Sequence, residues 1–193
     1  NLDQSTGWGR LAKKFESYLI LRGVEVGFIT QVSDTADTSS LIVPLRNFSW
    51  RRPLEIFRTF SKIRKFTKNY DFVLCFDANP YGIIMMFSLL GSGVPIALYG
   101  IGTYSLLTEN FLRNLLMRLS YAYANKVLIV SEFVKDQIRK SGLTLSNVSI
   151  IPVGVDPEFF HPVSSRPTMI HTPYILGVGA VKNRKGFHVS IEA

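Results

Sequence analysis

Short apolar runs alternate with helical patterns along most of this chain. Runs of mainly apolar residues predict buried strands at Val24–Thr30, Leu41–Leu45, Asp71–Asp77, Val94–Tyr99, Lys126–Val130 and Val148–Ile151. Between them, apolar positions at helical spacing predict helices at Trp8–Arg22, Pro53–Phe66, Pro80–Leu90, Leu106–Tyr123 and Ser131–Lys140. Short buried strands that alternate with helices are typical of the α/β class. We therefore expect a parallel sheet with helices on both faces.

The pattern changes after Asp156. Residues 157–173 are polar and interrupted by prolines, as in a linker. Residues 174–193 then begin a new unit, with an apolar strand, a glycine turn and a helix starting at Gly186. We expect a first domain at 1–156, a linker at 157–173 and the truncated start of a second domain at 174–193. A lone strand and two helical turns bury too little surface to fold alone, so we expect a longer parent protein.

Composition narrows the class of protein. The chain has 193 residues, of which 47% are hydrophobic, and this content suits a packed globular domain. Cys75 is the single cysteine, so no disulfide framework exists and a reducing compartment is expected. The longest apolar run, Ile83–Leu90, is too short to span a bilayer. We expect a cytoplasmic protein, with the inner face of the membrane left open.

Positive charge is concentrated in one segment. The net charge is +8, and Arg51–Lys68 holds a single acid, Glu55. One interpretation is an amphipathic helix that packs an aromatic stripe on the sheet and shows a solvated basic face. The other is a helix that contacts an anionic membrane or another polyanion. No nucleic-acid recognition module accompanies the charge, so we expect no nucleic-acid partner.

The residues that follow each strand are the candidate site. Ligands of open parallel sheets bind outside the carboxyl ends of the strands. Asp77 and Ser131 follow two of the strands, and Thr103 and Tyr104 offer hydroxyls after a third, next to two glycines. Asp77 has no second carboxylate near it in the sequence, so a general acid–base pair is not indicated, and a purely structural role for it stays open.

Two glycine-containing segments are candidate anion sites. Gly7-Trp8-Gly9-Arg10-Leu11-Ala12 matches a dinucleotide fingerprint, but no acid follows the next strand at Thr30. It predicts either a tight turn or amide groups that face an anion. Near the end of the chain, glycines and cations together suit a diphosphate: Gly177, Gly179, Lys182, Arg184, Lys185 and Gly186. The three histidines lack ligand spacing, so no metal site is expected.

Taken together, these segments resemble the retaining glycosyltransferases of family 4, which have the GT-B fold. Five motifs carry the resemblance in family order: Gly7-Trp8-Gly9 with Leu19–Val26, Gly93–Ile96 with Gly102–Tyr104, Val130-Ser131 with Val134–Asp136, Ile151–Asp156, and Gly177–Gly179 with Arg184–Gly186. The resemblance covers essentially the whole chain. It implies two Rossmann-like domains that face each other across a cleft, the first binding the acceptor and the second a nucleotide-activated sugar.

The resemblance also implies roles for individual residues. It places four of them near the donor diphosphate: Gly7, Gly9, Lys182 and Lys185. It places four others at the acceptor side of the cleft: Asp77, Thr103, Tyr104 and Ser131. It implies no cofactor and no essential metal. Three positions depart from the family pattern: Ile101 stands where many relatives carry a cleft histidine, Ala180 replaces an arginine, and Val153 replaces an asparagine.

We therefore expect a glycosyltransferase that moves a sugar from a nucleoside-diphosphate sugar to a saccharide or lipid-linked acceptor, with retention. This chain alone is expected to be inactive, because the first strand and most of the donor domain would lie outside it. Two alternatives stay open at this point. One is a dinucleotide-dependent oxidoreductase built on the Gly7 fingerprint, and the other is a peripheral membrane module that uses Arg51–Lys68.

Overall fold

A computed structural model describes residues 7–30, 40–43, 53–100, 110–155, 157, 160–162, 176–179 and 185–192. The chain forms two compact units, Asn1–Val153 and Gly154–Ala193. The described helices of the first unit are α1 (Gly7–Ile20), α2 (Pro53–Thr67), the π-helical turn η2 (Ala78–Gly82), α3 (Ile83–Leu89), α4 (Phe111–Tyr123) and α5 (Glu132–Lys140). Its described strands are β1 (Phe28–Thr30), β2 (Ser40–Ile42), β3 (Val73–Phe76), β4 (Ile96–Gly100), β5 (Lys126–Ile129) and β6 (Val148–Ile150).

Every described strand pair is parallel. The strands β1 and β2 form one sheet, and a second sheet has the order β3-β4-β5-β6. The register of the larger sheet pairs Cys75 with Leu98, Leu98 with Val127 and Val127 with Val148. A helix connects each strand of this sheet to the next, as parallel pairing requires. The expected α/β class is confirmed, with the Rossmann-like arrangement of strands and helices.

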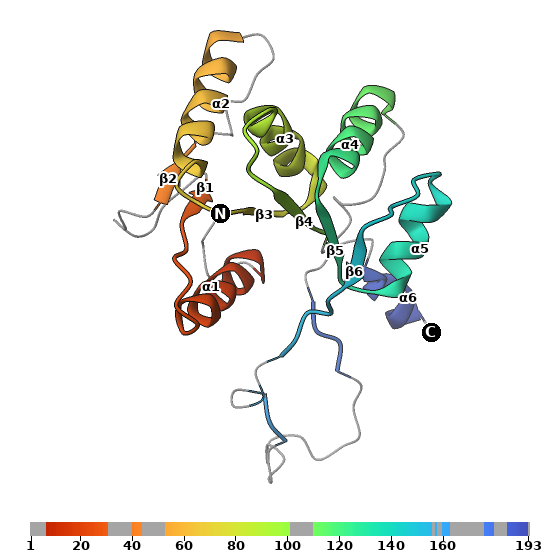
Figure 1. The fold of residues 1–193 in the computed structure, drawn as a ribbon. Coiled ribbons are helices and arrows are strands. Elements are labelled where there is room, and N and C mark those ends of the chain that lie inside the picture. The colour runs from red at the N-terminus through yellow and green to blue at the C-terminus, as the bar shows by residue number, and fades with distance from the viewer. Residues whose placement is uncertain are drawn as a thin grey trace. The chain divides into compact units, whose positions relative to one another are not determined.

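Helices cover both faces of the larger sheet. Side chains alternate between the two faces of a strand, so neighbours such as Cys75 and Phe76 point to opposite sides. Phe76 and Tyr99 face α1, where the Phe15 ring lies 6.0 Å from each of theirs. Cys75 and Leu98 point the other way, into the core beneath α3 and α4. Figure 1 shows α1 below the strands and α2, α3 and α4 above them.

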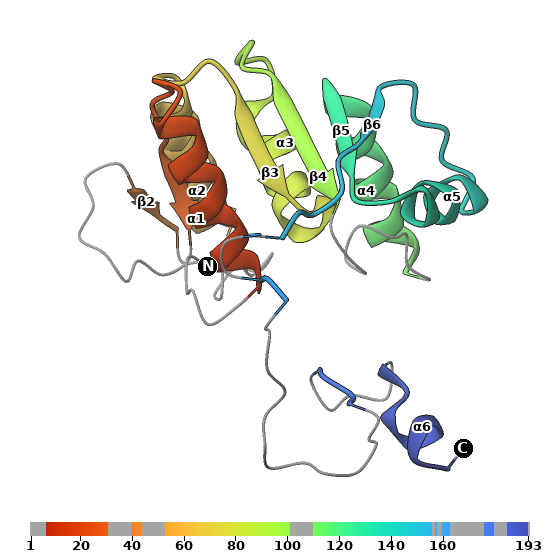
Figure 2. The ribbon, with the colours of Figure 1, turned by 90° about the horizontal axis from the view of Figure 1, so that it is seen from below.

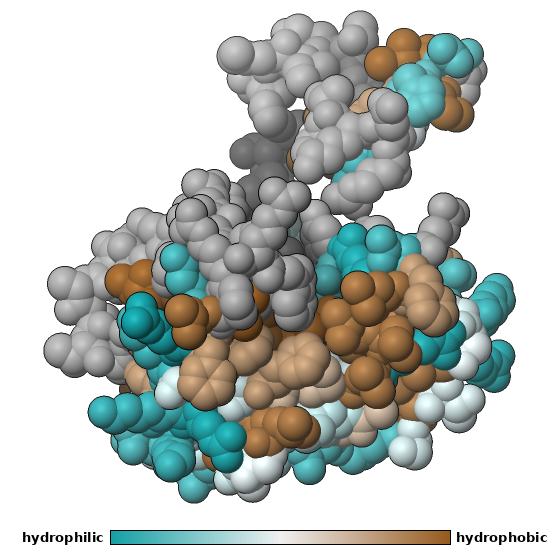
Figure 3. Space-filling view, turned by 90° about the horizontal axis from the view of Figure 1, so that it is seen from above, coloured by the Kyte–Doolittle hydropathy of each residue, from teal (hydrophilic) through white to brown (hydrophobic). Residues whose placement is uncertain are grey.

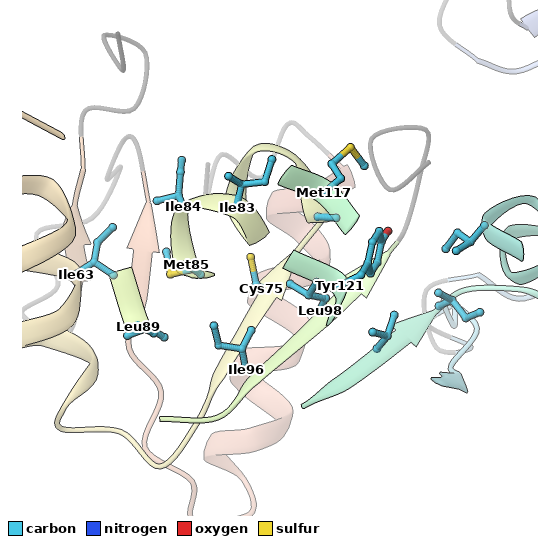
Figure 4. Packing of buried hydrophobic residues seen from close by; sticks show 14 of the residues in the cluster. Ile63, Cys75, Ile83, Ile84, Met85, Leu89, Ile96, Leu98, Met117 and Tyr121 are labelled. Carbon is cyan, nitrogen blue, oxygen red and sulfur yellow. The ribbon is translucent and has the colours of Figure 1, made fainter. Parts of the chain in front are cut away.

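The main core lies between this sheet and the helices above it. Figure 4 shows Cys75, Ile96 and Leu98 of the strands facing apolar side chains of α3 and α4, among them Met117. Ile63 brings α2 into the same cluster. Each large apolar side chain buried in this way contributes about 1.5–3 kcal/mol of transfer free energy. The core therefore fixes the helices on the strands, and with them the positions of the strand ends.

Local signals set most element ends as expected. Gly23, with a φ of 75°, ends the turn after α1, and the Ser131 side chain accepts from Val134 N at 3.3 Å to cap α5. One expectation was wrong: the helix predicted to start at Leu106 begins at Phe111. Asn110 has an extended backbone there, and its Oδ1 accepts from Arg113 N at 3.0 Å. The Asn110 side chain thus accepts from the Arg113 amide, which in a longer helix would donate to a backbone carbonyl.

The second unit contains the short helix α6 (Phe187–Glu192). The strand expected near Tyr174 is not found in its described part, because Leu176–Gly179 has an irregular backbone. A strand needs a hydrogen-bonded neighbour, and the described residues of this unit offer none. Gly177 and Gly179 have a packing reason instead: a Cβ atom would lie 3.0 Å and 3.3 Å, respectively, from the Phe187 ring.

Candidate functional site

The candidate site is the carboxyl edge of the β3-β4-β5-β6 sheet. Since these strands are parallel, the residues that follow them meet at one edge. Asp77 follows β3, Gly100 ends β4, Ser131 follows β5 by two residues and Ile151 follows β6. Figure 2 shows that α1 begins near the edge where β3 enters η2. The structure thus brings Asp77, Ser131 and the start of α1 to one side of the first unit.

Asp77 occupies a backbone conformation that is unusual for a residue with a side chain. Its φ is 71° and its ψ is 142°, and the residue is only 4% exposed. Asp77 N donates to Tyr99 O at 2.9 Å, while its carbonyl accepts from Gly82 N at 3.1 Å. These hydrogen bonds turn the chain sharply from β3 into η2. Strained, buried residues of this kind are concentrated at functional sites.

Burial keeps the neighbouring groups of Asp77 neutral. Burial, with a smaller contribution from the Asp77 charge, raises the pKa of the Cys75 thiol. Burial raises the pKa of Tyr81 in the same way, with smaller effects of Cys75 and Asp77. The thiol and the phenol therefore stay protonated at neutral pH. They therefore do not add negative charge to this edge, and Cys75 Sγ donates to Asp77 O at 3.7 Å.

A cation that the sequence analysis missed lies beside this turn. With the Asn79 amide oxygen facing α4, Asn79 Oδ1 accepts from Arg113 Nε at 3.0 Å and also from Arg113 Nη2. Arg113 lies in the first turn of α4 and its side chain is exposed. Asn79 thereby orients a solvent-facing guanidinium at the carboxyl edge. The position of Arg113 at the start of a helix that follows a strand could have marked it as a candidate. Its contact with Asn79 could not be predicted, because that contact depends on tertiary structure.

Tyr99 ties two strand ends together at the same edge. Its hydroxyl donates to Ile151 O at 2.9 Å, and this joins the end of β4 to the segment that leaves β6. Tyr99 is almost completely buried, and burial raises the pKa of its phenol. A protonated Tyr99 therefore holds the exit of β6 in place. This contact fixes the chain just before the boundary between the two units, at Val153.

The other candidates are placed as follows. Gly7 and Gly9 lie in the first turn of α1. Ser131 Oγ caps α5, so one of its lone pairs is already used. Lys185 is an exposed residue of the second unit. Five positions lie outside the described residues: Ile101, Thr103, Tyr104, Ala180 and Lys182.

Comparison with known families identifies the chain. The model of the family described as Glycosyltransferase Family 4 matches residues 6–159, which include all of the described strands. The chain belongs to glycosyltransferase family 4. The match begins just before α1 and includes Asp77, Arg113 and Ser131. No curated protein shows significant similarity to the chain.

Family membership supports a glycosyltransferase, and the expected resemblance is confirmed. The match does not favour the dinucleotide-dependent oxidoreductase. Gly7–Ala12 lies within α1 rather than in a loop before it, and the described end of β1, Thr30, is not an acid. Among the described helices, none is both long and apolar enough to cross a membrane.

Proposed function

We propose that the first unit is the acceptor-side domain of a glycosyltransferase that uses a nucleoside-diphosphate sugar and acts with retention. The observation that carries this proposal is the family match over residues 6–159. A parallel sheet that gathers Asp77, Ser131 and the start of α1 at its carboxyl edge supports it. The acceptor is a saccharide or a lipid-linked saccharide, and hydroxyl-rich ligands of this kind suit the polar groups of that edge.

On the acceptor side, we assign ligand contacts to Asp77, Thr103, Tyr104 and Ser131. A carboxylate accepts from sugar hydroxyls, and side-chain hydroxyls both donate and accept. Arg113 joins this group from its contact with Asn79. Its planar guanidinium suits a phosphate or carboxylate on the acceptor or donor, because both anions accept two parallel hydrogen bonds.

On the donor side, we assign contacts with the diphosphate to Gly7, Gly9, Lys182 and Lys185. The amide groups at the start of α1 favour an anion, as does the positive end of the helix dipole. Lysine ammonium groups stabilise the charge that develops on the leaving diphosphate. Neither role requires a metal ion, so we expect transfer to continue after chelation.

The test is a transfer assay on the full protein with a panel of labelled nucleoside-diphosphate sugars and a mixture of saccharides and lipid-linked saccharides. We expect one donor to label an acceptor, and NMR of the product to show the anomeric configuration of the donor. A product of inverted configuration would contradict retention. Excess EDTA should leave the rate within about twofold, whereas a loss restored by added divalent cation would show that a metal is essential.

Arg113 can be tested in the same assay. Arg113→Gln removes the guanidinium charge, and we expect kcat/KM to fall about tenfold to a hundredfold, in the range of a lost charged hydrogen bond. The matched control is Arg139→Gln on α5, an exposed arginine paired with Asp136 at 3.4 Å. It should leave kcat/KM unchanged. Equal losses in both variants would argue against a role for Arg113 at the site.

A further inference from the structure

One side of the first unit exposes large apolar side chains on three neighbouring helices. On α2, Leu54 and Phe57 are each 73% exposed, and on α4, Leu112 is 64% exposed. We call this surface the outer helix face, and define its apolar members as Leu54, Phe57, Phe87, Leu112, Leu115 and Leu119. Figure 3 looks onto the side where α2, α3 and α4 lie and shows an apolar band across it, with hydrophilic groups beside the band.

The three helices form one fixed layer. Phe60 of α2 stacks on Phe87 of α3, with ring centroids 5.9 Å apart. Arg64 Nη1 donates to Leu90 O at 3.1 Å, and Tyr123 Oη donates to Leu89 O at 2.7 Å. These contacts hold α2 and α4 on either side of α3. The apolar band is therefore continuous and preformed.

Helical spacing shows that the apolar members of the outer helix face on α2 and α4 are not core residues. Leu112, Leu115 and Leu119 recur at the spacing of one helix face, while Met117 and Tyr121 of the same helix are buried. On α2, Ile63 and Thr67 are buried, whereas Leu54 and Phe57 are exposed. Both helices thus have a second apolar side. Contiguous exposed apolar surfaces with polar groups around them mark interaction sites.

The charge on this face selects the kind of partner. Arg58, Lys62, Lys65 and Lys68 are exposed beside Leu54 and Phe57. Glu55 is the only acid of α2, and the sequences of α3 and α4 contain none.

The nearby helix α5 differs, because each of its two acids pairs with a cation of the same helix. Lys135 lies 3.2 Å from Glu132, and Arg139 lies 3.4 Å from Asp136. Paired charges of this kind are typical of a solvated helix. The outer helix face instead combines apolar groups with cations that outnumber the acids of its helices.

We propose that the outer helix face docks on an anionic lipid bilayer. Leucine and phenylalanine side chains would enter the boundary between headgroups and acyl chains, and the long lysine and arginine side chains would reach lipid phosphates. Charge complementarity favours this partner, since anionic leaflets attract basic segments next to apolar anchors. This surface lies on the outside of the helix layer and includes none of the residues assigned to the candidate site, although Leu112 is next to Arg113 in α4. Membrane docking does not depend on the proposed transferase activity.

Co-sedimentation of the full chain with vesicles tests the proposal. Vesicles of phosphatidylcholine with phosphatidylglycerol should bind the chain, and vesicles of phosphatidylcholine alone should bind it at least about tenfold more weakly. Added salt should weaken binding, because it screens exposed charges. Some binding should survive at high salt through the apolar contacts. No binding to the anionic vesicles at low salt would overturn the proposal.

Two double variants separate charge from insertion. Lys62→Glu/Lys65→Glu should weaken binding to anionic vesicles at least about tenfold and reduce its salt dependence. Leu54→Ser/Phe57→Ser should abolish the binding that survives at high salt. All four side chains are exposed, so the fold should persist, and far-UV circular dichroism checks this.

The controls carry matched changes elsewhere. Ile20→Ser/Leu21→Ser replaces exposed apolar residues at the end of α1, on the other side of the sheet, and Lys135→Glu/Lys140→Glu reverses two charges on α5. Both should bind vesicles like the parent. Equal losses in face and control variants would overturn the proposal. The proposal would also be overturned if the parent chain did not bind lipid but self-associated through this face. Sedimentation would then show self-association in the parent chain and its loss in the face variants.

Discussion

At the scale of single residues, Asp77 combines the features that point to the site. It is buried, it follows a strand, and its backbone has a positive φ that side chains other than Asn and Asp seldom adopt. Holding such a conformation costs about 1–3 kcal/mol. The hydrogen bonds of its backbone to Tyr99 and Gly82 offset this cost. The sequence identified Asp77 by its position after an apolar run, but it gave no sign of the strain.

The backbone of Asp77 can be tested with two substitutions that both remove the carboxylate. Asp77→Gly should be more stable than Asp77→Ala by about 1 kcal/mol, because glycine accepts the positive φ and alanine does not. Urea unfolding measures the difference. At Asp136, within α5, the order should reverse, with Asp136→Ala the more stable variant by about 1 kcal/mol. The same order at both positions would contradict a strained Asp77.

Cys75 gives a second test at this scale. The thiol is buried and unpaired to another cysteine, and burial raises its pKa above the usual value of 9.0. Only the thiolate reacts readily with disulfide reagents. We expect no reaction with Ellman's reagent in the folded chain at about pH 8, and one thiol per chain after unfolding in guanidinium. Rapid labelling of the folded chain would contradict the burial of Cys75.

Single-residue contacts also mark what the sequence could not predict. Arg113 and Asn79 are far apart in the chain, and only the packing of α4 beside η2 brings them together. Gly177 and Gly179 were predicted to form an anion site, and this stays a prediction. In the described structure a Cβ atom at either position would lie close to the Phe187 ring, a packing contact that the sequence did not indicate. A glycine pattern alone does not distinguish a ligand from a packed side chain.

At the scale of elements, side-chain caps decided which boundaries the sequence could predict. Ser131 was expected to cap α5 and does so, because the Ser hydroxyl satisfies an amide at the helix start. Asn110 caps α4 in the same way, but the apolar residues before it resembled a continuing helix, and the predicted start was therefore too early. The strands were predicted in the right order. Several predicted strands began too early, as at β1, predicted from Val24 and observed from Phe28, since apolar runs extend beyond the paired residues.

Ser131 has two roles to separate: it caps α5, and it is a proposed acceptor contact. Ser131→Ala should lower the free energy of unfolding by about 1 kcal/mol, whereas Ser131→Asp should keep the cap and restore most of that loss. If the hydroxyl also contacts the acceptor, both variants should raise KM. Asn110→Ala, which removes the cap of α4, is the matched control for stability. If KM rises only in the variants that lose stability, Ser131→Ala and Asn110→Ala, then Ser131 has the capping role alone.

At the scale of the whole molecule, the candidate site and the outer helix face lie on different parts of the first unit. The parallel sheet places polar groups at its carboxyl edge, and its helix layer carries the apolar band and the cations. The fold class could be predicted from the sequence because strand and helix periods alternate so regularly. The continuity of the apolar band could not, since it depends on how α2, α3 and α4 pack side by side.

The stability of the whole unit should fall in alkali, and the sign follows from three groups whose pKa values are raised by burial. Burial raises the pKa of Tyr81 and Tyr99 above 10.0, and that of Cys75 above 9.0. The unfolded chain releases these protons at the usual values, while the folded chain still holds them. Since the unfolded state then binds fewer protons, the free energy of unfolding decreases as pH rises. The loss should begin near the usual thiol value of 9.0 and steepen above 10.0.

Tyr81→Phe isolates one of these groups, because it removes the phenol proton and keeps the ring. Urea unfolding of the variant should show a shallower loss of stability above about pH 10 than the parent chain shows. Tyr18→Phe is the matched control. Tyr18 is 58% exposed, so its substitution should leave the slope unchanged. Parallel pH profiles for Tyr81→Phe and the parent would mean that the folded state does not hold the Tyr81 proton beyond its usual range, and that η2 does not bury this ring as the structure has it.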